Sequence, residues 1–134
     1  MKPLVILLSA LAAQAFATEA PKGAEVYIIS PKDGAVVKSP VVVEFGLKGM
    51  GIAPAGTDKA NTGHHHLLIN VKEEPKAGQA IPADAQHLHF GGGQTQTTLN
   101  LEKGTYHLQL NLGDMHHIPF EPPIVSPKIT IEVQ

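Results

Sequence analysis

Histidine is concentrated in three short segments of this chain. Seven of the eight histidines lie in residues 63–67 (GHHHL), 87–90 (HLHF) and 114–117 (DMHH), and the eighth, His107, stands alone. Histidine is the commonest side-chain ligand of transition metals, because neutral imidazole offers a nitrogen lone pair. The chain contains no cysteine. The three segments therefore predict a metal site built from imidazole, without thiolate.

Two of the segments contain the pattern H-x-H. On a β-strand, alternate side chains point to the same face and lie about 7 Å apart. His64 and His66 are therefore expected to share a face, whereas His65 points with the apolar residues of the strand that follows. His87 and His89 repeat this arrangement. Two such imidazoles can bind one ion, since metal–nitrogen bonds are about 2.0–2.1 Å long and the side chains span the remaining distance.

The third segment offers further ligands in the loop after an expected strand. Methionine sulfur there could bind Cu(I), although methionine is equally suited to filling gaps in a core. The predicted metal ligands are His64, His66, His87, His89, His116, His117 and Asp114, with His65, Met50 and Met115 as further candidates.

The ligand chemistry narrows the choice of metal and of function. Imidazole with optional carboxylate or thioether suits Cu(II), Zn(II) or Ni(II), and the Irving–Williams order favours copper, with zinc second. The sequence thus favours copper binding or delivery. One alternative is a metal-dependent hydrolase or oxidase with Glu44, Asp114 or Glu121 as base, but no carboxylate stands at a recognised catalytic spacing from a histidine. The other is a structural or adhesive β module whose histidines only form hydrogen bonds.

The first 17 residues have the pattern of a cleaved signal peptide. Lys2 precedes an apolar stretch over residues 4–13, and small residues, Ala15 and Ala17, stand before the expected cut. The apolar stretch is shorter than the roughly 20 residues that span a bilayer. We expect a mature chain of residues 18–134 that is periplasmic or secreted and has no membrane attachment after cleavage.

The charge composition excludes one class of partner. The 10 basic residues are all lysine, and they are balanced by 12 acidic ones. Nucleic-acid binding usually requires dense patches of arginine and lysine, so it is not expected here. The expected partners are a metal ion and another periplasmic protein.

Apolar residues alternate with polar ones as in half-buried β-strands. Such stretches cover residues 26–29, 41–47, 67–71, 106–112 and 129–133. Residues 72–86, rich in proline, alanine and charge, are expected to form a long loop. Residues 18–134 are therefore predicted to be a single all-β domain, a small antiparallel β-sandwich that is immunoglobulin-like in the loose sense. A barrel of the cupin or jelly-roll type is the alternative.

Several motifs are also similar to those of an uncharacterised bacterial family of exported domains, a domain of unknown function. The motifs are residues 45–56 (FGLKGMGIAPAG), 63–69 (GHHHLLI), 89–95 (HFGGGQT), 112–114 (LGD), 117–119 (HIP) and 122–123 (PP). The resemblance spans about residues 24–133. It implies an exported single domain whose histidines act together, and it implies neither an activity nor a particular metal.

Overall fold

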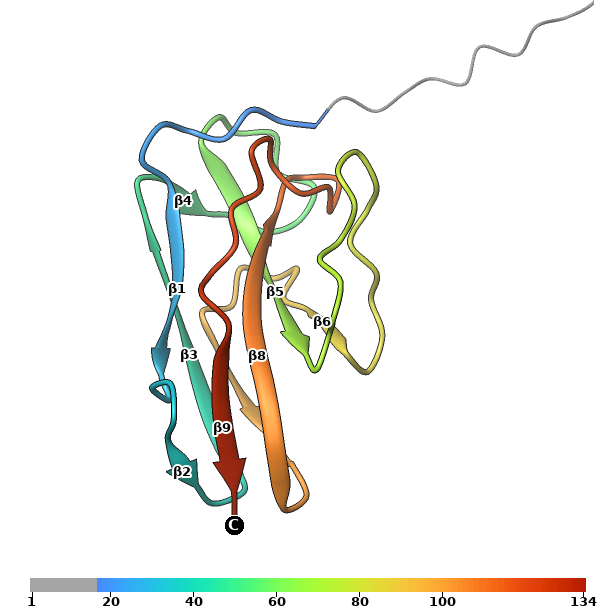
Figure 1. The fold of residues 1–134 in the computed structure, drawn as a ribbon. Helices are drawn as coiled ribbons and strands as arrows, with labels where there is room; N and C mark the ends of the chain where they lie inside the picture. Colours follow the sequence, from blue (N-terminus) through green and yellow to red (C-terminus); the bar gives the residue numbers. More distant parts are fainter. Residues whose placement is uncertain (1–16) are drawn as a thin grey trace, which may run out of the picture.

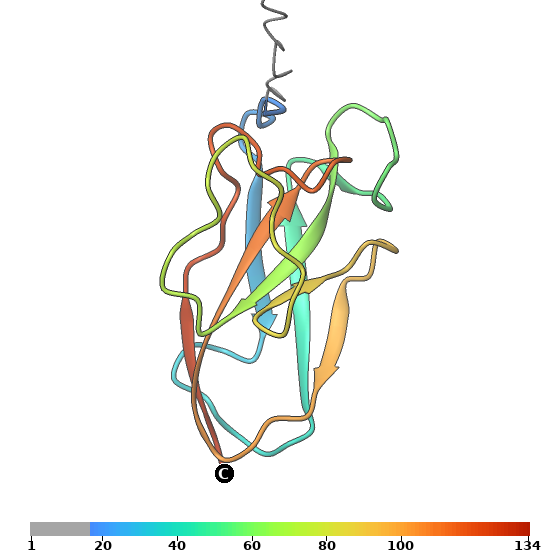
Figure 2. The ribbon, with the colours of Figure 1, turned by 90° about the vertical axis from the view of Figure 1, so that its right-hand side faces the viewer.

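The computed structural model describes residues 17–134, so the predicted signal peptide, except for Ala17, lies outside the described residues. Residues 17–134 form nine strands in two sheets that face each other (Figures 1 and 2). The strands are β1 (Glu25–Ser30), β2 (Val36–Val37), β3 (Val41–Lys48), β4 (Gly51–Ile52), β5 (Thr62–Ile69), β6 (His87–His89), β7 (Gln96–Leu99), β8 (Gly104–Gly113) and β9 (Ile129–Val133). The predicted β-sandwich is confirmed, and the barrel alternative is wrong because the two sheets remain separate.

Strand β5 pairs with three other strands of the larger sheet. The smaller sheet has the order β1-β3-β7, and the larger one has the order β2-β9-β8-β5-β4, with β6 also paired to β5. The pairing is antiparallel except at β2 with β9 and β4 with β5, where strands of two residues run parallel to their partners. The sheets are therefore mixed at these short pairs rather than purely antiparallel as predicted. Within residues 17–134, no helix is long and apolar enough to cross a membrane.

The core lies between the two sheets and follows the predicted alternation. Val43 and Phe45 of β3 face Leu67 of β5 and Leu110 of β8, and all four are buried. Because alternate residues of a strand face opposite ways, the polar residues that alternate with the core residues of β5 and β8 lie on the outer face of the larger sheet. The histidines at positions 64 and 66 are among them.

This outer face is also covered. All residues of β5 after Thr62 are buried, including Leu68, which is 2% exposed on the outer face. The long loop between β5 and β6 passes across β5 and β8 in Figure 2. It is fixed at both ends and in its middle, because Ile69 N donates to Gln86 O and Ile81 N donates to His117 O. The sandwich thus has a partial third layer, and the histidines lie at its border.

Candidate metal centre

Four histidines from three separate segments meet on the outer face of the larger sheet. His64 and His66 come from β5, His89 from β6, and His117 from the loop after β8. One ring nitrogen of each lies within 4.8 Å of those of the others. The expected meeting of the three segments is confirmed. The cluster lies on the outer face of the larger sheet, because His64 and His66 point away from the core.

Strand register brings the first three histidines together. His66 pairs directly with His89 of β6, and His64 lies two residues further along the same face of β5. Ring centroids are 4.7 Å apart for His64 and His66, and 5.0 Å apart for His66 and His89. The local sequence contributes to this because the H-x-H pattern of β5 keeps His64 and His66 on one side of the strand.

The fourth histidine is positioned by a turn that depends on Asp114. Oδ1 of Asp114 accepts hydrogen bonds from the backbone nitrogens of His116 (2.8 Å) and Ile118 (3.1 Å), and its Oδ2 accepts one from Thr18 Oγ1 (2.8 Å). His117 N donates to the backbone oxygen of Asp114. His117 itself adopts a left-handed conformation with φ of 65°. The turn directs the His117 ring to within 4.5 Å of the His89 ring, centroid to centroid.

The buried imidazoles of the cluster are held in their neutral form. Burial, followed by the nearby His117 and His89, lowers the pKa of His64 to about 4, with a smaller opposing effect of Asp114. Burial, followed by His64 and His89, lowers the pKa of His66 to about 3. Burial also lowers the pKa of His89. Because a metal ligand must be deprotonated, these rings are ready to bind at neutral pH.

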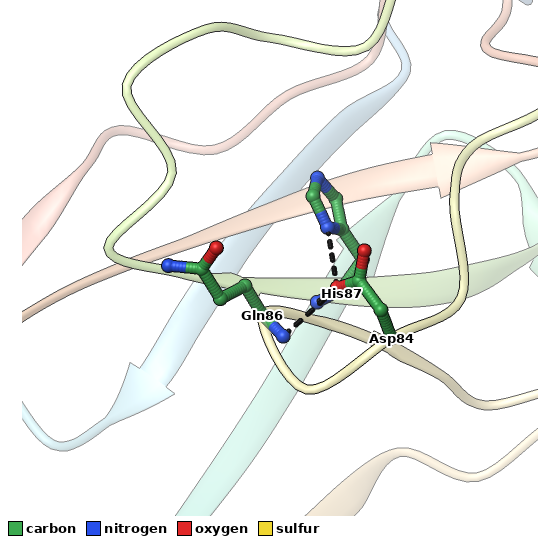
Figure 3. A network of polar contacts seen from close by, with 3 residues as sticks. All are labelled: Asp84, Gln86 and His87. Carbon is green, nitrogen blue, oxygen red and sulfur yellow. Dashed lines mark hydrogen bonds and ion pairs between the residues drawn. The ribbon is translucent and has the colours of Figure 1, made fainter.

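His87, although in the same H-x-H pattern as His89, has a different partner. Its Nδ1 lies 2.8 Å from Oδ1 of Asp84, which also accepts hydrogen bonds from the backbone nitrogens of Gln86 and His87 (Figure 3). The hydrogen bond with the His87 side chain is the main cause of the lowered pKa of Asp84. His87 thus stays outside the four-histidine cluster.

The remaining predicted ligands also lie outside the cluster. His116 is exposed, and Met115 is half-buried in the same loop. Met50 packs against the hydrophobic core. His65 points inward, as its place in the alternation predicts, and packs against Phe45 with ring centroids 5.1 Å apart.

His107, which is not among the predicted ligands, lies beside Thr130.

The carboxylates considered as catalytic bases are not part of the cluster either. Among the described residues, the group that can hold an ion consists of imidazoles alone. Glu44 is exposed on β3 of the opposite sheet. Glu121 is exposed and forms a backbone bridge with Glu19. Asp114 is engaged in the turn described above. The arrangement is therefore suited to binding a metal ion through nitrogen.

Comparison with known proteins gives one match. A family model described as Domain of unknown function (DUF4399) fits residues 43–134. The chain belongs to this family. The match begins within β3 and includes all four histidines of the cluster. No curated protein and no solved structure matches the chain.

Sequence reasoning missed one residue of this site. Asn111 of β8 pairs directly with His66 and is 1% exposed. In the sequence it resembles any outward polar residue of an alternating strand, like its neighbour Gln109. Only the register of β5 against β8 shows that it lies beside a cluster histidine, and this register is not readable from either strand alone.

Proposed function

We propose that this protein binds one transition-metal ion through His64, His66, His89 and His117, with copper as the preferred metal and zinc second. Four neutral nitrogen donors suit both ions, and the Irving–Williams order favours copper at such a site. We further propose that it carries the ion outside the cytoplasm, which is supported by the signal-peptide pattern of residues 1–17.

The observation that supports metal binding best is the surroundings of Nε2 of His64. This atom lies 3.1 Å from Nδ1 of His117 and 3.2 Å from Nε2 of His89. An imidazole nitrogen has a single in-plane site, which is either an N–H or a lone pair. It can therefore form a good hydrogen bond with only one of the two neighbours. Hydrogen bonding alone, as in a structural module, leaves the second contact without an explanation.

A metal ion accounts for both contacts. With metal–nitrogen bonds of 2.0–2.1 Å, the nitrogens of a tetrahedral site are separated by about 3.3 Å. The two distances at His64 are close to this edge length. Binding then requires only a small contraction of the cluster, because all four nitrogens already lie within 4.8 Å of one another.

The exposure of the ligands favours a carrier over a purely structural metal site. His64 and His66 are buried in a central strand, whereas His89 is exposed and His117 is half-buried. A partner can therefore reach the ion from the side of His89 and His117. The ion can then be released without opening the core, because His89 and His117 lie outside the core.

Metal analysis of untagged protein tests the proposal. The protein is expressed with its N-terminal segment, purified without a histidine tag or a nickel column, and titrated with Cu(II) and Zn(II) in a calorimeter. We expect one ion per chain, with copper bound more tightly than zinc. The matched control is His107→Ala, which removes an exposed histidine outside the cluster and should bind like wild type. Failure to retain either ion in stoichiometric amount would overturn the proposal.

Export is tested separately. The protein is fractionated from the cells in which it is expressed, and its N-terminus is sequenced. We expect it in the periplasmic or secreted fraction, beginning at Thr18. An intact N-terminus in the cytoplasmic fraction would contradict export without affecting the metal site.

A further inference from the structure

Asn111 is a buried polar residue whose side chain forms no hydrogen bond with the described residues. It is 1% exposed, and neither Oδ1 nor Nδ2 has a hydrogen-bond partner among residues 17–134. A buried amide without partners destabilises the folded protein, because it has given up its hydrogen bonds to water. Such a residue calls for a functional explanation.

The neighbouring position on the same face of β8 differs, because its buried amide has a hydrogen-bond partner. Gln109 is also buried, and its Nε2 donates to Ser126 O at 3.0 Å. The outer face of β8 can therefore satisfy a buried amide where the surroundings are built for it. At Asn111 the surroundings include His66 of the four-histidine cluster instead.

The group that faces Asn111 is His66. The two residues are direct partners in the β5–β8 register, and Cβ atoms of such pairs are about 4.5–5.5 Å apart. Nδ1 of His66 is likewise buried without a partner in the described structure. This nitrogen faces β8, because a Cβ placed on Gly113 of that strand would lie 3.1 Å from it. Asn111 and His66, each with a buried polar group that has no partner, are thus cross-strand neighbours on adjacent strands.

We propose that Asn111 is a positioning residue for the metal site, and this inference rests on the proposed function. In the metal-loaded protein its Oδ1 accepts a hydrogen bond from Nδ1–H of His66, which leaves Nε2 of that ring free to bind the ion. A ligating imidazole usually donates its second N–H to such an acceptor, which fixes the tautomer and the ring orientation and increases the basicity of the ligand.

The proposal predicts that affinity and stability change in opposite directions when Asn111 is replaced. Asn111→Leu removes the acceptor, so zinc affinity should fall by about tenfold to a hundredfold, the usual effect of losing such a partner. The same change removes an unsatisfied buried amide, so the metal-free variant should melt at a higher temperature than wild type. A residue with a merely structural role would not separate the two effects in this way.

The experiment compares three variants with wild type by competition titration with a chromophoric zinc chelator and by thermal melting without metal. Asn111→Leu should show the two opposite changes. Asn111→Asp keeps an acceptor and should bind zinc nearly as tightly as wild type. Asn100→Leu makes the same chemical change at an exposed position and should leave zinc affinity unchanged.

Nitrogen NMR of the zinc-loaded wild-type protein observes the His66 ring directly. It therefore does not depend on whether any variant folds. We expect the proton of the His66 ring on Nδ1 and the metal on Nε2. Metal on Nδ1, or wild-type affinity in Asn111→Leu, would overturn the role of Asn111 while leaving the metal site intact. If wild type bound neither zinc nor copper, the proposed function itself would fail, and this inference with it.

Discussion

Gly113 lies directly against the ring of His66. A Cβ placed on Gly113 would be 2.7 Å from Cε1 of His66 and 3.4 Å from Cα of His117. Gly91 has the same relationship to His89, because its Cβ would lie 2.7 Å from Nε2 of that ring. Two glycines thus leave the space in which two of the cluster imidazoles lie.

Replacing Gly113 with alanine should therefore weaken metal binding. The added methyl group must displace the His66 ring from its place in the cluster, and we expect at least about a tenfold loss of copper and zinc affinity, or about 1.4 kcal/mol. Calorimetric titration measures the effect. The matched control is Gly51→Ala, whose Cβ would meet only Cγ2 of Thr62 at 3.8 Å. Equal affinities for the two variants would show that the His66 ring is not a ligand in its present position.

The adjacent residues His116 and His117 provide a second test. His117 belongs to the cluster, whereas His116 is exposed outside it. We expect His117→Ala to lower metal affinity by about tenfold or more, because it removes a metal–nitrogen bond, and His116→Ala to have little effect. Likewise, His89→Ala should lower metal affinity by about tenfold or more, whereas His87→Ala should have little effect. A comparable loss from His116→Ala or His87→Ala would contradict the ligand set proposed here.

Strand periodicity alone explains part of the site. It predicted that His64 and His66 share a face and that His65 points into the core, because alternation is a local property of a strand. It could not separate His116 from His117, since their directions depend on a turn held by the Asp114 carboxylate and on a left-handed residue.

The same limit applies to the other H-x-H pair. His87 and His89 are equivalent in sequence, but Asp84, three residues before His87, bonds to its ring. The β-sandwich itself was predictable from the alternation of apolar residues. The covering of its outer face by the loop between β5 and β6 was not, because that loop has neither a periodic pattern nor a sequence signal for the surface on which it packs.

The metal-free protein should lose stability as the medium becomes acidic. In the folded state the pKa of His64 is about 4 and that of His66 about 3, against about 6.5 for histidine in an unfolded chain. The unfolded chain therefore binds more protons below about pH 6.5, and the free energy of unfolding falls from there down to about pH 4. Above about pH 6.5 it should be nearly constant. Urea unfolding of chelator-treated protein at a series of pH values measures this, and a free energy that rises on acidification would contradict it.

Metal affinity should also depend on pH. The part of the loss that comes from protonation of the buried ligands should occur well below pH 7. Protons compete with the ion only where they bind the free ligand, and the pKa values of His64 and His66 put that competition near pH 4 and below. Competition titrations from pH 8 to pH 4 should show the steepest loss of affinity toward the acidic end. If the whole loss were complete near pH 6.5, the buried rings would not be bound as neutral ligands.

His65 should affect stability without affecting the metal. Its ring is 1% exposed, and neither ring nitrogen has a hydrogen-bond partner among residues 17–134. Replacement by leucine removes this unsatisfied polar group, so we expect the free energy of unfolding to rise by about 1–3 kcal/mol. The gain should be larger at pH 5 than at pH 8, because burial lowers the pKa of His65 to about 4 and the unfolded wild-type chain gains a proton at pH 5 that the folded chain does not.

Urea unfolding and metal titration of His65→Leu at both pH values measure these effects, with His116→Leu as an exposed control. Metal affinity should match that of wild type, since the His65 ring faces Phe45 on the opposite side of the strand from the cluster. A tenfold loss of affinity in His65→Leu without a loss of stability would mean that the inner face of β5 takes part in metal binding, and the division of the three consecutive histidines between core and site would be wrong.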